Sequence, residues 1–186
     1  MSGLSWNQAL ITQQVDGTAL TNSTTATAIE AAQAKLTIAA NSLTIGSTFR
    51  VIAAGRISTV TAAPGTLLLE LRIGASTVIF SGGAMALNVT AQTNATWSLE
   101  AFLTVRADGS VTTVIGVGTW TSRAVIGSGA AGTTGVGVLT LPDTAPVVGT
   151  AFDNTASQTL DLYATWSTAN AANSIQTHIF AIESLN

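Results

Sequence analysis

The chain has 186 residues and a net charge of −3, and only 8% of its residues are charged. It contains no cysteine, which excludes disulfides and thiolate metal sites. The six basic residues lie far apart and there is a single histidine, so the composition argues against phosphate neutralisation on nucleic acid and against enzymatic chemistry.

Hydroxyl side chains supply most of the polarity. The 31 threonines and 16 serines are short and uncharged, and threonine is β-branched, so it fits a pleated sheet better than a helix. No segment is long and apolar enough to predict a membrane-spanning helix, and the start lacks the pattern of a secretory signal. The sequence therefore predicts an all-β protein that has no membrane partner and is made in the cytoplasm.

Residues 1–30 differ from the rest of the chain, because they combine weak periodicity with strong turn chemistry. We interpret them as an extended N-terminal arm or loosely tied first strand, followed by one domain over residues 31–186. Residues 26–35 are rich in alanine and have good helix propensity, so a short helix is a second possibility there.

From residue 36 onward the hydrophobic period is two, which predicts strands. The clearest alternation covers residues 97–106, and Asp108-Gly109 then supplies the turn of a hairpin with residues 111–120. Further strands are expected at 49–57, 67–73, 136–141, 160–166 and 174–183. About eight irregularly spaced strands favour a two-sheet antiparallel β-sandwich, with a jelly roll as the commonest eight-stranded solution.

One glycine-rich segment matches a nucleotide-binding spacing. Residues 127–132 read Gly-Ser-Gly-Ala-Ala-Gly after a strand-like run, but residues 133–137 cannot form the helix whose N-terminus would bind a pyrophosphate. We interpret this segment as a loop between strands and expect no cofactor.

The other chemically interesting residues are few. His178, the only imidazole, shares a strand face with Phe180 and Ile182 in a regular strand, so we expect a packed core or interface residue rather than a catalytic one. Asp153 and Asp161 lie near a loop, but nothing around them resembles a calcium loop, so no metal site is predicted.

Tryptophans offer the alternative of sugar binding. Trp97 and Trp166 are in phase with the buried positions and are expected in the core, whereas the position of Trp120 at a strand end leaves its role open. Candidate interface or ligand contacts are Trp6, Trp120, Arg50, Arg56 and Arg72. The charged residues at 50, 56, 70, 72, 100 and 106 face away from apolar rows, which predicts cross-strand or inter-subunit ion pairs.

Several stretches resemble β-rich structural proteins of tailed bacteriophages, such as capsid decoration proteins and minor head or tail proteins. They are FRVIAAGRIS at 49–58, PGTL at 64–67, LRIG at 71–74, WSLE at 97–100, TVR at 104–106, ATWS at 164–167 and NSIQ at 173–176. The resemblance spans residues 43–183. It implies a jelly-roll module that self-associates, often as a trimer, and docks on a virion lattice, with no catalytic residue to carry over.

Two functions are therefore expected. The first is a non-enzymatic virion structural protein, a capsid decoration or cement protein whose partners are copies of itself and the major capsid protein or another virion component. The alternative is a carbohydrate- or receptor-binding sandwich module of a phage tail, which would require at least one tryptophan ring exposed in a groove.

Overall fold

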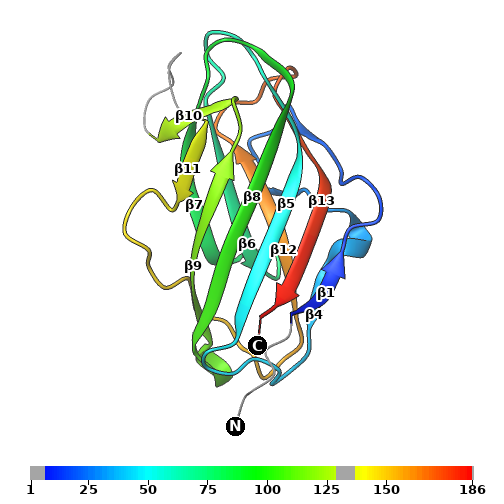
Figure 1. Cartoon of the computed structure of the whole chain (residues 1–186), viewed down its shortest axis with the longest axis vertical. Helices are drawn as coiled ribbons and strands as arrows, with labels where there is room; N and C mark the ends of the chain where they lie inside the picture. The colour runs from blue at the N-terminus through cyan, green and yellow to red at the C-terminus, as the bar shows by residue number, and fades with distance from the viewer. Residues whose placement is uncertain (1–6, 129–136, 186) are drawn as a thin grey trace.

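The structure, a computed structural model, describes residues 7–128 and 137–185 as two antiparallel β-sheets packed face to face (Figure 1). The prediction of an all-β sandwich is confirmed. Sheet A contains, in spatial order, β1 (Gln8–Thr12), β13 (Ser174–Ser184), β5 (Thr48–Thr59), β8 (Gln92–Ala107), β9 (Thr113–Thr121) and β11 (Val138–Leu141), with β2 (Leu20–Thr21) also paired to β13. Sheet B contains β10 (Val125–Ser128), β7 (Thr77–Leu87), β6 (Thr66–Ile73), β12 (Gln158–Trp166) and β3 (Thr27–Ala28), with β4 (Leu36–Ile38) also paired to β12.

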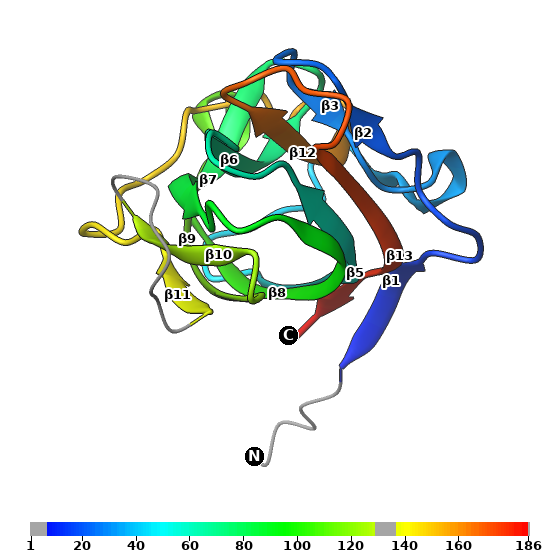
Figure 2. The same cartoon turned by 90° about the horizontal axis from the view of Figure 1, so that it is seen from above.

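Strands from the two ends of the chain pair with each other in both sheets. The first long strand, β5, pairs with the last, β13, and β6 pairs with β12 in the other sheet. From β9 to β13 each successive strand lies in the opposite sheet, so the two layers are linked repeatedly around one core (Figure 2). The hairpin predicted at Asp108-Gly109 is present between β8 and β9, with Gly109 at φ +81°.

The core follows the alternation of the sequence. In β8 the residues Trp97, Leu99, Ala101, Leu103 and Val105 are all buried, while Phe102 points outward. Trp97 and Trp166 are fully buried, as predicted, and Trp97 stacks on the equally buried Trp120 with ring centroids 5.0 Å apart. The tryptophans of the described chain therefore stabilise the packing between the sheets.

The helix considered for residues 26–35 is absent. The structure has β3, a single 3-10 turn at Ala32–Ala34 and β4 in its place. The backbone of Ile29 donates to the Leu162 carbonyl of β12, 3.0 Å away, so strand pairing outweighs the local helix propensity. Within the described ranges no helix is long and apolar enough to cross a membrane.

Residues 8–35 lie along one edge of both sheets (Figure 2). β1 and β2 pair with β13 in sheet A, and β3 pairs with β12 in sheet B. Residues 13–35, which we call the N-terminal edge segment, thus pass from one sheet to the other. This passage brings together the polar groups described next.

Candidate functional site

Arg50 lies on the outer face of sheet A, near the start of β5. Its guanidinium lies between two carboxylates of neighbouring strands, with Nε 2.7 Å from Glu100 Oε1 and Nη1 3.4 Å from Glu183 Oε2. The Glu100 carboxylate raises the pKa of Arg50 above its ordinary value. The predicted cross-strand ion pair is present, and Arg56 makes a neutral counterpart by donating from Nε to Gln176 Oε1 at 3.0 Å.

We call Arg50, Glu100 and Glu183 the charged triad. An apolar patch adjoins it. Phe102 of β8 stands opposite Val117 of β9, and the next outward position of β9, Ile115, stands opposite Val148 of the loop that follows β11. Phe102, Val117 and Val148 are 41%, 43% and 48% exposed. We call Phe102, Ile115, Val117 and Val148 the sheet A patch. Apolar groups beside ion-paired side chains form a surface suited to contact with another protein.

Arg72 lies on the other layer. Its Nε donates to Glu70 Oε2 at 3.1 Å in the same strand, and the guanidinium carbon lies 4.6 Å from the centre of the Tyr163 ring. Both contacts are internal to sheet B. The three predicted arginines therefore do not converge on one site.

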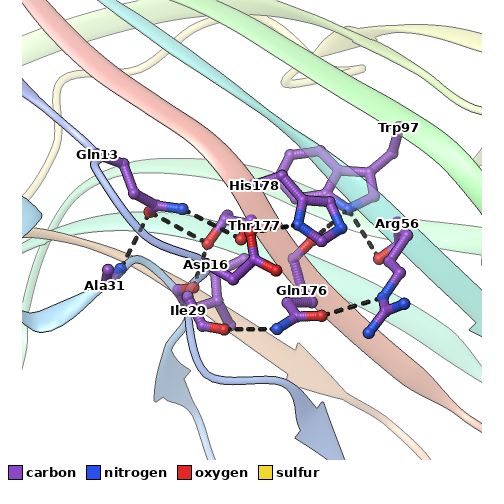
Figure 3. Close-up of polar contacts among 10 residues, drawn as sticks. Gln13, Asp16, Ile29, Ala31, Arg56, Trp97, Gln176, Thr177 and His178 are labelled. Atoms are coloured by element: carbon purple, nitrogen blue, oxygen red, sulfur yellow. Dashed lines mark hydrogen bonds and ion pairs between the residues drawn. The ribbon is translucent and has the colours of Figure 1, made fainter.

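His178 occupies a β-bulge, which overturns the expectation that it packs beside Phe180. The register between β13 and β5 shifts between Thr177 and Ile179, so Thr177 and Phe180 point inward and His178 turns outward. The His178 Nδ1 lies 2.8 Å from Asp16 Oδ1, with both groups partly exposed (Figure 3). An extra residue in one strand reverses the alternation of inward and outward side chains beyond it. The hydrophobic pattern of the sequence does not indicate where such a residue lies.

The bulge is held by side chains of the N-terminal edge segment. Gln13 donates from Nε2 to the Thr177 carbonyl at 3.1 Å and accepts at Oε1 from the Ala31 backbone at 3.0 Å (Figure 3). The buried Thr177 hydroxyl donates to the Ile29 carbonyl, and Gln176 donates to the Gly17 carbonyl at 2.8 Å. These bonds link two segments that are far apart in the sequence.

Two glycines make this close approach possible. A Cβ on Gly17 would lie 2.0 Å from the Ile29 carbonyl oxygen, and a Cβ on Gly55 would lie 1.9 Å from the Gln176 carbonyl oxygen. Trp97 completes the cluster by donating from Nε1 to the carbonyls of Arg56 and Gln176 at 3.1 and 3.2 Å (Figure 3). Any larger side chain at either glycine would push the bulge away.

Two buried carboxylates lie at the far end of the N-terminal edge segment. Glu30 and Asp161 share the Lys35 ammonium, whose Nζ is 3.4 Å from Glu30 Oε1 and 3.0 Å from Asp161 Oδ2. Burial, followed by the repulsion of Asp161, raises the pKa of Glu30 to about 7. Sequence reasoning missed this cluster, because its members carry no shared motif or period.

The remaining predicted positions do not form a chemical site in the described chain. Trp120 is buried, whereas Trp6 and most of the glycine-rich segment 127–132 lie outside the described residues. Asp153 accepts from the Thr155 hydroxyl and backbone, which lowers its pKa. Among residues 7–128 and 137–185 no three metal-ligating side chains cluster, and no hydroxyl contacts the His178 ring.

A hollow opens at one end of β8 and β9. It has a volume of about 440 Å³ and is lined by Asn94, Ala95, Thr96, Trp97, Ser98, Thr121, Ser122 and Arg123. The Trp97 side chain is buried beneath it, and the accessible lining combines methyl and methylene groups with hydroxyl, amide and guanidinium groups. Such a lining can donate and accept hydrogen bonds but offers no aromatic face for stacking.

No protein-family model matches the chain, and no curated protein matches it. A comparison with solved structures finds the CBM2 module of the evolved Dit protein of Lactobacillus casei BL23 phage J-1. The match has a TM-score of 0.33 and 12% sequence identity, and it covers 82% of this chain and 69% of that chain.

Proposed function

We propose that the chain is a non-enzymatic structural protein of a phage virion, a capsid decoration or cement protein that forms a trimer and docks on the lattice of the major capsid protein. The observation that carries this proposal is the outer face of sheet A. There the exposed sheet A patch lies beside an arginine that is already ion-paired with two carboxylates of the same chain. The sequence resemblance to phage structural proteins supplies the virion context.

The physical properties of this face suit burial against a protein. The four long strands β13, β5, β8 and β9, spaced about 4.8 Å apart and about 30 Å long, present roughly 600 Å², which is three quarters of the roughly 800 Å² that each partner contributes to a standard interface. Most other outward positions carry threonine, serine or small apolar groups, which cost less to dehydrate than unpaired charges. On this face Arg50 is ion-paired with Glu100 and Glu183, and Arg56 is hydrogen-bonded to Gln176, whereas Arg106 is exposed.

The sheet A patch can be tested by two substitutions to threonine, a polar residue that favours β-strands. Phe102→Thr combined with Val117→Thr should convert the oligomer to monomers in light scattering and lower retention on purified phage heads by about tenfold or more, because two exposed apolar side chains lose their contact. The matched control is Val15→Thr, a 61% exposed valine that is not part of the sheet A patch, which should leave both measurements unchanged. A wild-type chain that is strictly monomeric and is not retained on heads would contradict the proposal.

Carbohydrate binding is the alternative function, and the feature that favours it is the hollow between Asn94 and Arg123, which has hydrogen-bonding side chains in its lining. Trp97, Trp120 and Trp166 are all buried, so a sugar would bind there through polar groups rather than by stacking on these rings. A glycan array decides between the two functions. Binding that is lost in Arg123→Ala while the sheet A double variant binds normally would favour the sugar-binding function.

A further inference from the structure

The buried cluster of Glu30, Lys35 and Asp161 contains an unbalanced charge. Two carboxylates face one ammonium, and the Glu30 and Asp161 side chains are almost fully buried while Lys35 is partly exposed. Asp161 Oδ1 has no hydrogen-bond partner, and Glu30 Oε1 has no partner other than the Lys35 ammonium 3.4 Å away. A buried acceptor without a donor destabilises the fold, so the cluster is short of one donor hydrogen.

A single proton would correct both defects. With a proton on one of the two carboxyls, the cluster becomes neutral, and the new O–H supplies the donor that the cluster lacks. The other charged groups nearby already have interaction partners. Arg72, opposite Asp161 in the β12–β6 register, binds Glu70 and covers the Tyr163 ring, and the Asp16–His178 pair lies on the sheet A side of the segment.

Glu30 also completes the hydrogen bonding at the edge of β12. Between β3 and β4 the N-terminal edge segment leaves β12, and the Glu30 Oε2 atom takes the place of a strand carbonyl by accepting from the Leu162 backbone N–H at 3.1 Å. The Leu162 carbonyl in turn accepts from the Ile29 backbone at 3.0 Å. The protonation of the cluster is therefore coupled to the pairing of residues 29–35 with sheet B.

We propose that Glu30, Lys35 and Asp161 form a proton-dependent latch, which holds the N-terminal edge segment on β12 while one proton is shared between the two carboxyls and loosens when that proton is lost. The latch is independent of the proposed function in the virion. Its direction follows from the sign of the shift: the pKa of Glu30 is raised from 4.5 to about 7, so the closed state binds more protons than the open one and weakens as the pH rises through this range.

Amide hydrogen exchange on the full-length chain tests the latch. After correction for intrinsic exchange, the Leu162 amide should open about thirtyfold more often at pH 8.5 than at pH 5.5, because only the closed state has the raised pKa. In Glu30→Gln the amide oxygen still accepts from Leu162 and the amide NH2 is a permanent donor, so this dependence should vanish. Glu100→Gln, which removes an exposed carboxylate from the triad on sheet A, is the matched control and should keep the wild-type profile.

A second measurement needs no variant. In a carbon-13 NMR titration of the wild-type carboxyls, Glu30 should titrate near neutral pH and the Leu162 amide shift should follow the same curve. This measurement decides the matter even if Glu30→Gln fails to fold. A Glu30 carboxyl that titrates near 4.5, or Leu162 protection that is constant from pH 5.5 to 8.5, would overturn the latch.

Discussion

The two edges of the sandwich are closed by different kinds of contact. At one, residues 13–35 pass from β13 to β12 and are fastened by side-chain hydrogen bonds and by three charged groups. At the other, residues 141–152 pass from sheet A to sheet B through backbone bonds, from Gly149 to the Val114 carbonyl and from Thr150 to the Val78 carbonyl. Leu141 and Phe152 pack into the core beside them.

This difference separates two ways of perturbing the protein. A chain with 8% charged residues buries charge at the N-terminal edge, so proton concentration and single polar atoms should matter there. The opposite edge depends on side-chain volume and should respond to lost methylene groups instead. Three substitutions test this division.

The largest effect is expected from Gly55→Ala at the N-terminal edge. Its Cβ would lie 1.9 Å from the Gln176 carbonyl oxygen, so the β13 bulge must move and its bonds to Gly17 and Trp97 must break. We expect a loss of about 3 kcal/mol or more in the free energy of unfolding, measured by urea denaturation.

The matched control is Gly82→Ala, where the nearest atom is the flexible end of the Leu141 side chain at 3.0 Å. That side chain can shift by a few tenths of an ångström, so the control should cost much less. Equal stability of the two variants would show that the bulge is not fixed against β5.

The sequence predicted the regular part of this architecture because a regular strand has a period. β8 has one face in the core and one outside, so its buried residues could be named from alternation alone. The strand β7 was not predicted, since Ser81, Gly82 and Gly83 interrupt its pattern and the register with β6 shifts at two places. Irregularities of this kind break the alternation of a regular strand, so they cannot be predicted from it.

The candidate sites were predicted less well for the same reason. The Arg50 pairs follow from strand phase, and they are present. The outward turn of His178 depends on one extra residue in β13, and the Glu30–Asp161 cluster depends on the path of residues 29–35 between β3 and β4. Both are set by tertiary pairing, which outweighed the helix propensity of residues 26–35 as well.

Phe152→Ala tests the opposite edge. Phe152 is 7% exposed and pairs through its backbone with Thr112, so removing the ring leaves a cavity without removing a hydrogen bond. We expect a loss of about 3 kcal/mol that is the same at pH 5.5 and pH 8.5. Phe152→Leu, which keeps part of the volume, should lose about half as much, and a strong pH dependence of either loss would contradict the division between the edges.

The smallest expected effect, and the sharpest test of the N-terminal edge, is Thr177→Val. The valine has nearly the same shape, but it cannot donate to the buried Ile29 carbonyl, so we expect a loss of about 1–2 kcal/mol in thermal or urea unfolding. Thr59 is the matched control, because its buried hydroxyl has no hydrogen-bond partner. Thr59→Val should therefore be neutral or stabilise the fold by up to about 1 kcal/mol. If both variants lose stability equally, side-chain shape rather than the hydroxyl of Thr177 holds the bulge, and the N-terminal edge would depend on packing in the same way as the opposite one.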